Sequence, residues 1–196
     1  MLHISRRAKI MIALAAIVVG GAVVGRMSIS SGKIPSEFQE SRLQGALISQ
    51  TIVNLSNELA GDLERVNQFH AQGNTKDALA LTTELFKKSE EVRGQAVSLS
   101  NEVGKMTSAL SGVKSTEARE AAFESIADRL ALITRLVNYS DYLARLLNAL
   151  HDRFAGVGSG RSVEALIQQI NAEVTAINNF NRQAGQAMDR FDQIVK

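Results

Sequence analysis

Two histidines in the body of the chain, His70 and His151, are the residues best suited to metal or acid–base chemistry. Asp77 and Asp152 lie near them in the sequence and are the further ligands that a shared site would use. A protein metal site needs three or four such donors that converge on one point. A histidine in the last turn of a helix also interacts favourably with the free carbonyl groups and the helix dipole. The two histidines are therefore weak metal candidates, and we expect no metal centre.

Two serines interrupt otherwise apolar stripes, and these are the positions at which a ligand pocket is most plausible. Ser89 and Ser140 occupy stripe positions, and Tyr142 follows two residues after the second serine. Polar side chains at core positions of a helical bundle either fix the register of the helices or line a pocket. Fixing the register is the simpler interpretation, and Ser89, Ser140 and Tyr142 are the pocket positions if the second one holds.

Residues that would support catalysis are otherwise missing from the pattern. The chain has no cysteine, which excludes thiolate chemistry and disulfides. Its carboxylates include the adjacent pair Glu90 and Glu91, but adjacent positions on a helix point apart and cannot share a proton. We therefore expect a protein that is not an enzyme and that uses no cofactor.

The net charge of +2 comes from the beginning of the chain. Arg6, Arg7, Lys9 and Arg26 precede residue 27, and no acidic residue accompanies them. The remainder carries 18 basic and 20 acidic residues and has no basic stripe. A nucleic-acid partner is therefore not expected, because binding to a phosphate backbone relies on concentrated positive charge.

Residues 10–25 form an uncharged, strongly apolar segment behind a basic N-terminus. A membrane-spanning helix needs about 20 such residues, and the segment approaches this length if it continues through Arg26 to Ile29. We interpret residues 1–30 as a retained signal-anchor, that is, one transmembrane helix. Its flanking charges favour a cytoplasmic N-terminus and an extracytoplasmic body. The alternative is a cleaved signal peptide that leaves a secreted body.

Two glycines within this segment, Gly21 and Gly25, have the spacing that lets two membrane helices approach closely. They are a possible membrane-helix contact, although small residues at this spacing are also frequent by chance.

The body after the linker 31–35 has the pattern of a helical bundle. A single proline and the absence of tryptophan disfavour β-architectures, and glycine-containing breaks divide residues 36–196 into four segments of similar length. Each segment carries apolar residues at spacings of three and four, such as Ile126, Leu130, Ile133 and Val137 in the third. The expected helices cover approximately residues 36–70, 75–110, 115–154 and 162–195.

Four helices of similar length joined by short connections predict an all-α, antiparallel, up-down-up-down four-helix bundle with coiled-coil-like packing and a dry core. The alternative is a pair of helical hairpins that associate only on dimerisation. The general plan is similar to that of the membrane-anchored four-helix sensor domains of bacterial receptors, at the level of fold alone.

These features lead to a ranked set of functions. The first is a non-enzymatic, membrane-anchored extracytoplasmic bundle that acts through protein–protein contacts, as a scaffold, a spacer or an assembly subunit with a protein partner or a second copy. The second is a ligand-binding, sensor-like bundle that works with a separate signalling partner. A metalloprotein that uses His70 and His151 ranks below both.

Overall fold

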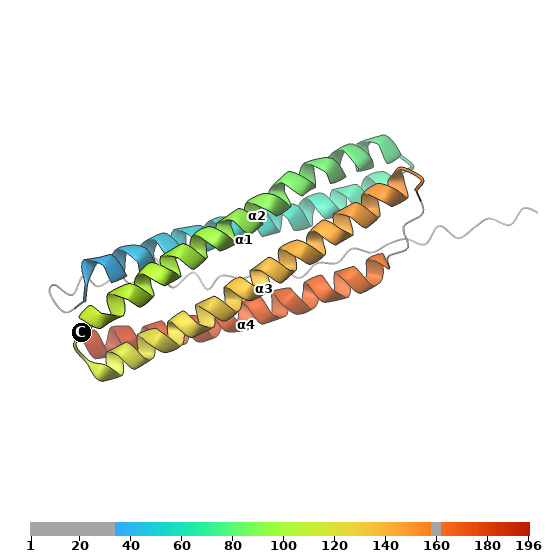
Figure 1. Ribbon diagram of the computed structural model, residues 1–196. Coiled ribbons are helices and arrows are strands. Elements are labelled where there is room, and N and C mark those ends of the chain that lie inside the picture. The colour runs from blue at the N-terminus through green and yellow to red at the C-terminus, as the bar shows by residue number, and fades with distance from the viewer. Residues whose placement is uncertain (1–33, 158–161) are drawn as a thin grey trace, which may run out of the picture.

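Long α-helices make up almost all of the described chain, which covers residues 34–157 and 162–196 of the computed structural model (Figure 1). Among these residues there is no strand, so the prediction of an all-α bundle is confirmed. Each helix begins and ends within one residue of its expected bounds. The elements are α1 (Ser36–Ala71), α2 (Thr75–Ala109), the short 3₁₀ turn η1 (Leu110–Gly112), α3 (Thr116–Phe154) and α4 (Val163–Val195).

The expected membrane segment, residues 1–30, lies outside the described residues, and so do Gly21 and Gly25. Within the described ranges, none of the helices is long and apolar enough to cross a membrane.

The turn between α1 and α2 explains why the chain reverses there. Gly73 has a φ of 79°, which is the left-handed conformation that glycine adopts without strain. Its backbone N–H donates to the carbonyl of His70, and that of Asn74 donates to the carbonyl of Phe69, so the end of α1 is satisfied. The side chain of Asn74 then accepts a hydrogen bond from the backbone N–H of Asp77 and caps α2, as the sequence predicts.

The connection between α2 and α3 lies against the beginning of α1. A Cβ atom added to Gly112 would approach Cγ of Pro35 to 2.6 Å, so only glycine fits at this contact. Ser115 then caps α3 by accepting from the backbone N–H of Ala118. One end of the bundle therefore holds the start of α1, the end of α2 and the start of α3.

Consecutive helices pack along their length, first α1 with α2, then α2 with α3, then α3 with α4 (Figure 1). The two hairpins therefore pair within one chain. Between α1 and α4 the backbones approach little, and these two helices meet through side chains where α1 begins and α4 ends. There the rings of Phe38 and Phe191 lie 5.2 Å apart, centroid to centroid. The seam between α1 and α4 is thus the loosest side of the bundle.

The core is built mainly from aliphatic side chains, but one expectation about it is wrong. Leu130, expected in the core, is 46% exposed, and its neighbour Arg129 is buried with 8% exposed. The physical reason is the rotation of α3, because Ile126, Arg129, Ile133 and Leu136 follow the inward spacing of three and four residues. The buried polar or charged residues are Ser41, Ser56, Thr82, Ser89, Ser125, Arg129, Ser140 and Glu173.

Candidate functional site

The two histidines lie in the last turns of α1 and α3 but do not form a site with converging ligands. The ring of His70 packs against that of Phe154, with centroids 5.0 Å apart. Nδ1 of His151 lies 3.7 Å from Oδ1 of Asp152, and both side chains are substantially exposed. Within residues 34–157 and 162–196, no three His, Asp or Glu side chains gather in the way that a metal ion requires.

Ser89 and Ser140 meet across the interface of α2 and α3. The hydroxyl of Ser140 donates a hydrogen bond of 3.1 Å to the backbone carbonyl of Ser89, and both residues are buried. Oγ of Ser89 has no hydrogen-bond partner among the described residues. Tyr142 is half-buried, and Cζ of Arg145 lies 5.7 Å from the centroid of its ring. The contact between the serines supports the register interpretation, because one hydroxyl fixes the height of α3 against α2.

One of the two tyrosines that flank Ser140 in the sequence is fully buried. Tyr139 points into the core from α3, and the hydroxyl of Ser56 on α1 lies near it without the geometry of a hydrogen bond. Burial raises the pKa of Tyr139 to about 12, and the nearby Ser56 hydroxyl offsets this only in part. A tyrosine this well buried stays neutral throughout the physiological range.

An unusual charged group involves three helices, and we call it the arginine cluster: Arg42 on α1, its ion-pair partner Asp192 on α4, and Arg129 on α3, which the positive charge of Arg42 affects. Nη1 and Nη2 of Arg42 donate to Oδ1 and Oδ2 of Asp192 at 2.6 and 2.7 Å, a two-pronged pair that joins α1 to α4. Nε of Arg42 is buried and has no partner among the described residues.

Arg129 is the member of the cluster that lacks a counter-ion. Its Nε is buried without a hydrogen-bond partner, and no hydrogen bond or ion pair joins Arg129 to another described residue. Burial lowers its pKa to about 10, and the positive charge of Arg42 contributes to the same shift. The guanidinium is nevertheless charged at neutral pH, so the bundle contains a buried positive charge that no carboxylate balances.

The nearest acidic residues on α3 form no ion pair with Arg129. Glu124 forms an ion pair with Arg190 on α4. Burial raises the pKa of Asp128, the negative charge of Glu124 raises it further, and Arg190 offsets part of the shift. Asp128 and Arg129 occupy adjacent positions on α3, so their side chains point apart.

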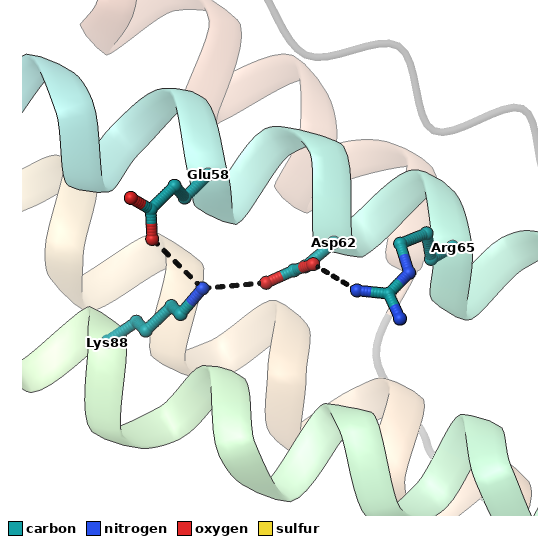
Figure 2. Close-up of polar contacts among 4 residues, drawn as sticks. All are labelled: Glu58, Asp62, Arg65 and Lys88. Atoms are coloured by element: carbon teal, nitrogen blue, oxygen red, sulfur yellow. Dashed lines mark hydrogen bonds and ion pairs between the residues drawn. The ribbon is translucent and has the colours of Figure 1, made fainter.

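A second charged group lies between α1 and α2, and Figure 2 shows its four side chains. Nζ of Lys88 lies 2.8 Å from Oδ2 of Asp62 and 3.1 Å from Oε2 of Glu58, and Nη1 of Arg65 lies 2.9 Å from Oδ1 of Asp62 (Figure 2). Burial alone would raise the pKa of Asp62, but the hydrogen bonds from Lys88 and Arg65 outweigh it and lower the pKa. The hydrogen bond to Asp62 raises the pKa of Lys88. Every charge in this group has a partner, so the group fastens α1 to α2.

The outward side of α3 carries a second apolar pattern, which we call the outer stripe: Phe123, Ala127, Leu130, Thr134 and Val137. Phe123 is 62% exposed, Leu130 is 46% exposed and Val137 is half-buried. Their spacing of seven residues, with Ala127 and Thr134 exposed between them, is the spacing of a coiled-coil seam.

The outer stripe continues onto α2. The ion pair of Arg93 with Asp141 aligns the outer surfaces of α2 and α3. One turn from this pair, Val97 on α2 therefore lies level with Val137 on α3. Val97 is 56% exposed, so the apolar surface spans both helices.

Comparisons with protein-family models, with curated proteins and with solved structures find no match to this chain.

Proposed function

We propose that the protein is a non-enzymatic helical bundle, tethered at the outer face of a membrane by its N-terminal segment, that acts by binding another protein. The observation that carries this proposal is the outer stripe of α3. An isolated bundle has no need of a heptad pattern on a face that points away from its own core. Large apolar side chains that share one exposed face are typical of surfaces that a partner covers.

The form of the stripe indicates the kind of partner. Apolar side chains repeated every seven residues on a straight helix pack best against another helix, whose side chains fit between them. Phe123 is the large aromatic residue that anchors many such interfaces. The partner that fits is therefore an amphipathic helix, supplied by another protein or by a second copy of this chain.

The anchor rests on the sequence of residues 10–25, which is apolar and follows several basic residues. The chain enters the bundle at Ile34, beside the connection that precedes α3. A membrane at the N-terminal side would therefore face the end of the bundle at which the outer stripe begins. This arrangement would hold the stripe at a fixed height above the membrane. The intact mass of the mature protein distinguishes a retained anchor from a cleaved signal peptide.

Site-specific photocrosslinking in native membranes tests the contact. A crosslinking residue at position 130 should give one defined product, whereas the same residue at position 47 should not. Leu47 is a matched control, because it is 48% exposed and also apolar but lies on α1. Equal products from both positions, or only the monomer from both, would contradict the proposal. A product of twice the chain mass would identify the partner as a second copy.

The alternative function, a ligand-binding bundle that works with a separate signalling partner, is favoured by a different observation. The buried and unbalanced charge of Arg129 is what a site for an anionic ligand would require.

A further inference from the structure

The arginine cluster holds two guanidinium groups and one carboxylate. Both carboxylate oxygens of Asp192 accept hydrogen bonds from Arg42, so Asp192 is already paired. Arg129, 8% exposed, is therefore left with a positive charge in a medium that solvates charges poorly. Leaving a buried charge without a partner is costly, and proteins usually supply a counter-ion.

No aspartate or glutamate among the described residues forms an ion pair or a hydrogen bond with Arg129. Residues 1–33 and 158–161 contain no aspartate or glutamate. On α3, Glu124 is paired with Arg190. The buried Glu173 on α4 faces Arg135, and Glu102 on α2 is paired with Lys105. A group from another molecule would balance Arg129 without breaking these contacts.

Two small residues of α1 lie level with Arg129. His70 on α1 packs on Phe154 on α3, and Ser56 on α1 lies near Tyr139 on α3. The two helices run in the same direction, and the difference in residue number between level positions is therefore nearly constant. The same difference brings Gly45 and Ala46 on α1 level with Arg129.

The hydrogen bond from Ser125 to the carbonyl of Ala184 sets the register of α3 against α4. Because the two helices run antiparallel, Ala184 lies about one turn from Arg129, and the half-buried Phe180 lies level with it. This level belongs to the seam between α1 and α4, whose backbones approach little. Separated backbones are what a short ligand would need in order to reach the guanidinium.

We propose that Arg129, assisted by Arg42, binds one oxyanion, the carboxylate or phosphoryl group of a small molecule, in the seam between α1 and α4. A guanidinium presents N–H donors in a planar fork that matches two oxygens of such a group. Arg42 adds positive charge beside the site while Asp192 holds it in place. This site is independent of the outer stripe, so its test does not depend on the protein partner.

Isothermal titration calorimetry on the full-length chain tests the site. Sodium phosphate and sodium acetate are titrated separately at constant ionic strength, with sodium chloride as the reference salt. We expect saturable binding of at least one of the two oxyanions. Preference for phosphate indicates a phosphoryl ligand, and preference for acetate indicates a carboxylate ligand.

Two variants locate the binding. Arg129→Met should weaken it by roughly tenfold or more, because charge-assisted hydrogen bonds are lost. Arg182→Met removes the same charge from an exposed position on α4 at nearly the same level, and it should bind as the wild type does. Equal binding by the wild type and Arg129→Met would overturn the proposal, as would the absence of saturable binding in the wild type.

Nuclear magnetic resonance of the arginine side chains provides a readout that does not require Arg129→Met to fold. In the wild-type chain, the Nε–Hε signals of Arg129 and Arg42 should move on addition of the oxyanion that binds, and chloride should not move them. Arg129→Lys, which keeps the charge but loses the fork, assigns the signal and should bind more weakly than the wild type. Shifts confined to exposed arginines would overturn the proposal.

Discussion

At the scale of single residues, the environment of Arg129 sets an energetic balance that can be measured. An unpaired buried charge loses its hydration and gains no Coulombic attraction in return. The methylene groups of Arg129 pack in the core, so only its guanidinium lies in an unfavourable environment. Arg129 therefore stabilises the fold less than an apolar side chain of similar length would.

We expect Arg129→Met to raise the free energy of unfolding by about 1–4 kcal/mol when no oxyanion is present, in line with other replacements of buried charged groups. Methionine keeps an unbranched side chain that adapts to the same space. Denaturant unfolding in a chloride buffer measures the change. Arg182→Met, at an exposed position, should change it by no more than about 0.5 kcal/mol. A loss of stability in Arg129→Met alone would mean that Arg129 has a stabilising partner.

Tyr139 predicts a distinctive response to alkaline pH. Its pKa is raised to about 12 in the folded chain, whereas an unfolded tyrosine titrates near the usual value of 10.0. The unfolded state therefore loses this proton first, and stability falls as pH rises between these two values. Tyr139→Phe should make the fall in stability between about pH 10 and 12 less steep. Tyr142→Phe is the matched control and should leave the slope unchanged, which unfolding curves at a series of pH values will show.

At the scale of elements, the group around Asp62 and Lys88 determines how firmly α1 is fastened to α2. The pKa of Asp62 is lowered in the folded chain, so its stabilising effect is present above its unfolded pKa, near 3.8, and is lost as pH falls through the folded value. Asp62→Asn should lower stability at neutral pH by about 0.2–1 kcal/mol, the usual range for pairs near the surface.

The measurement for this pair is a double-mutant cycle with Lys88→Met, at neutral pH and again near pH 3. We expect a coupling between Asp62 and Lys88 at neutral pH that shrinks in acid, because a protonated carboxyl no longer attracts the ammonium. A coupling of the same size at both pH values would mean that packing, and not charge, joins the two residues.

The helices themselves follow from the sequence, but the rotation of α3 does not. Glycine-containing breaks and capping residues such as Asn74 and Ser115 are local signals, so the bounds are readable without tertiary information. Arg129 and Leu130 are neighbours, and propensity alone favours the leucine for the core. Packing against three other helices decides otherwise. The available signal was the unbroken spacing of three and four that runs through Ile126, Arg129 and Ile133.

Two substitutions test the rotation of α3. Leu130→Glu should change the free energy of unfolding by no more than about 0.5 kcal/mol, because the new carboxylate stays in water. Ile133→Glu, three residues further along, should abolish cooperative unfolding or cost several kcal/mol, because it buries an unpaired charge. Thermal unfolding followed by circular dichroism compares the two variants. Similar losses from both would place Leu130 in the core, as the periodicity of the sequence suggested.

At the scale of the whole molecule, the arginine cluster shows which kind of site a sequence alone does not reveal. Arg42, Arg129 and Asp192 come from three helices, and no local motif connects them. Only the packing of the end of α4 beside the beginning of α1 brings Arg42 and Asp192 together. Ser89 and Ser140 were foreseeable, because each one interrupts an apolar stripe on its own helix.

The bundle should fold without its N-terminal segment. Every described core residue lies at or after residue 34, and Pro35 contacts Gly112. A chain of residues 34–196 should therefore unfold cooperatively in aqueous buffer, with a free energy of unfolding within about 1 kcal/mol of the full-length value. Circular dichroism with denaturant measures both chains, the longer one in mild detergent and the shorter one with and without it.

The result separates two roles for residues 10–25. A segment that lies in a membrane contributes nothing to the packing of the bundle, so its removal should leave stability unchanged. A segment that covers the outer stripe of α3 would instead stabilise α3, and its removal would lower stability and expose Phe123 and Leu130 to self-association. Sedimentation of the shorter chain, compared with its Leu130→Glu variant, distinguishes these cases. We expect equal stability in the two chains, together with an outer stripe that is open to a partner in both.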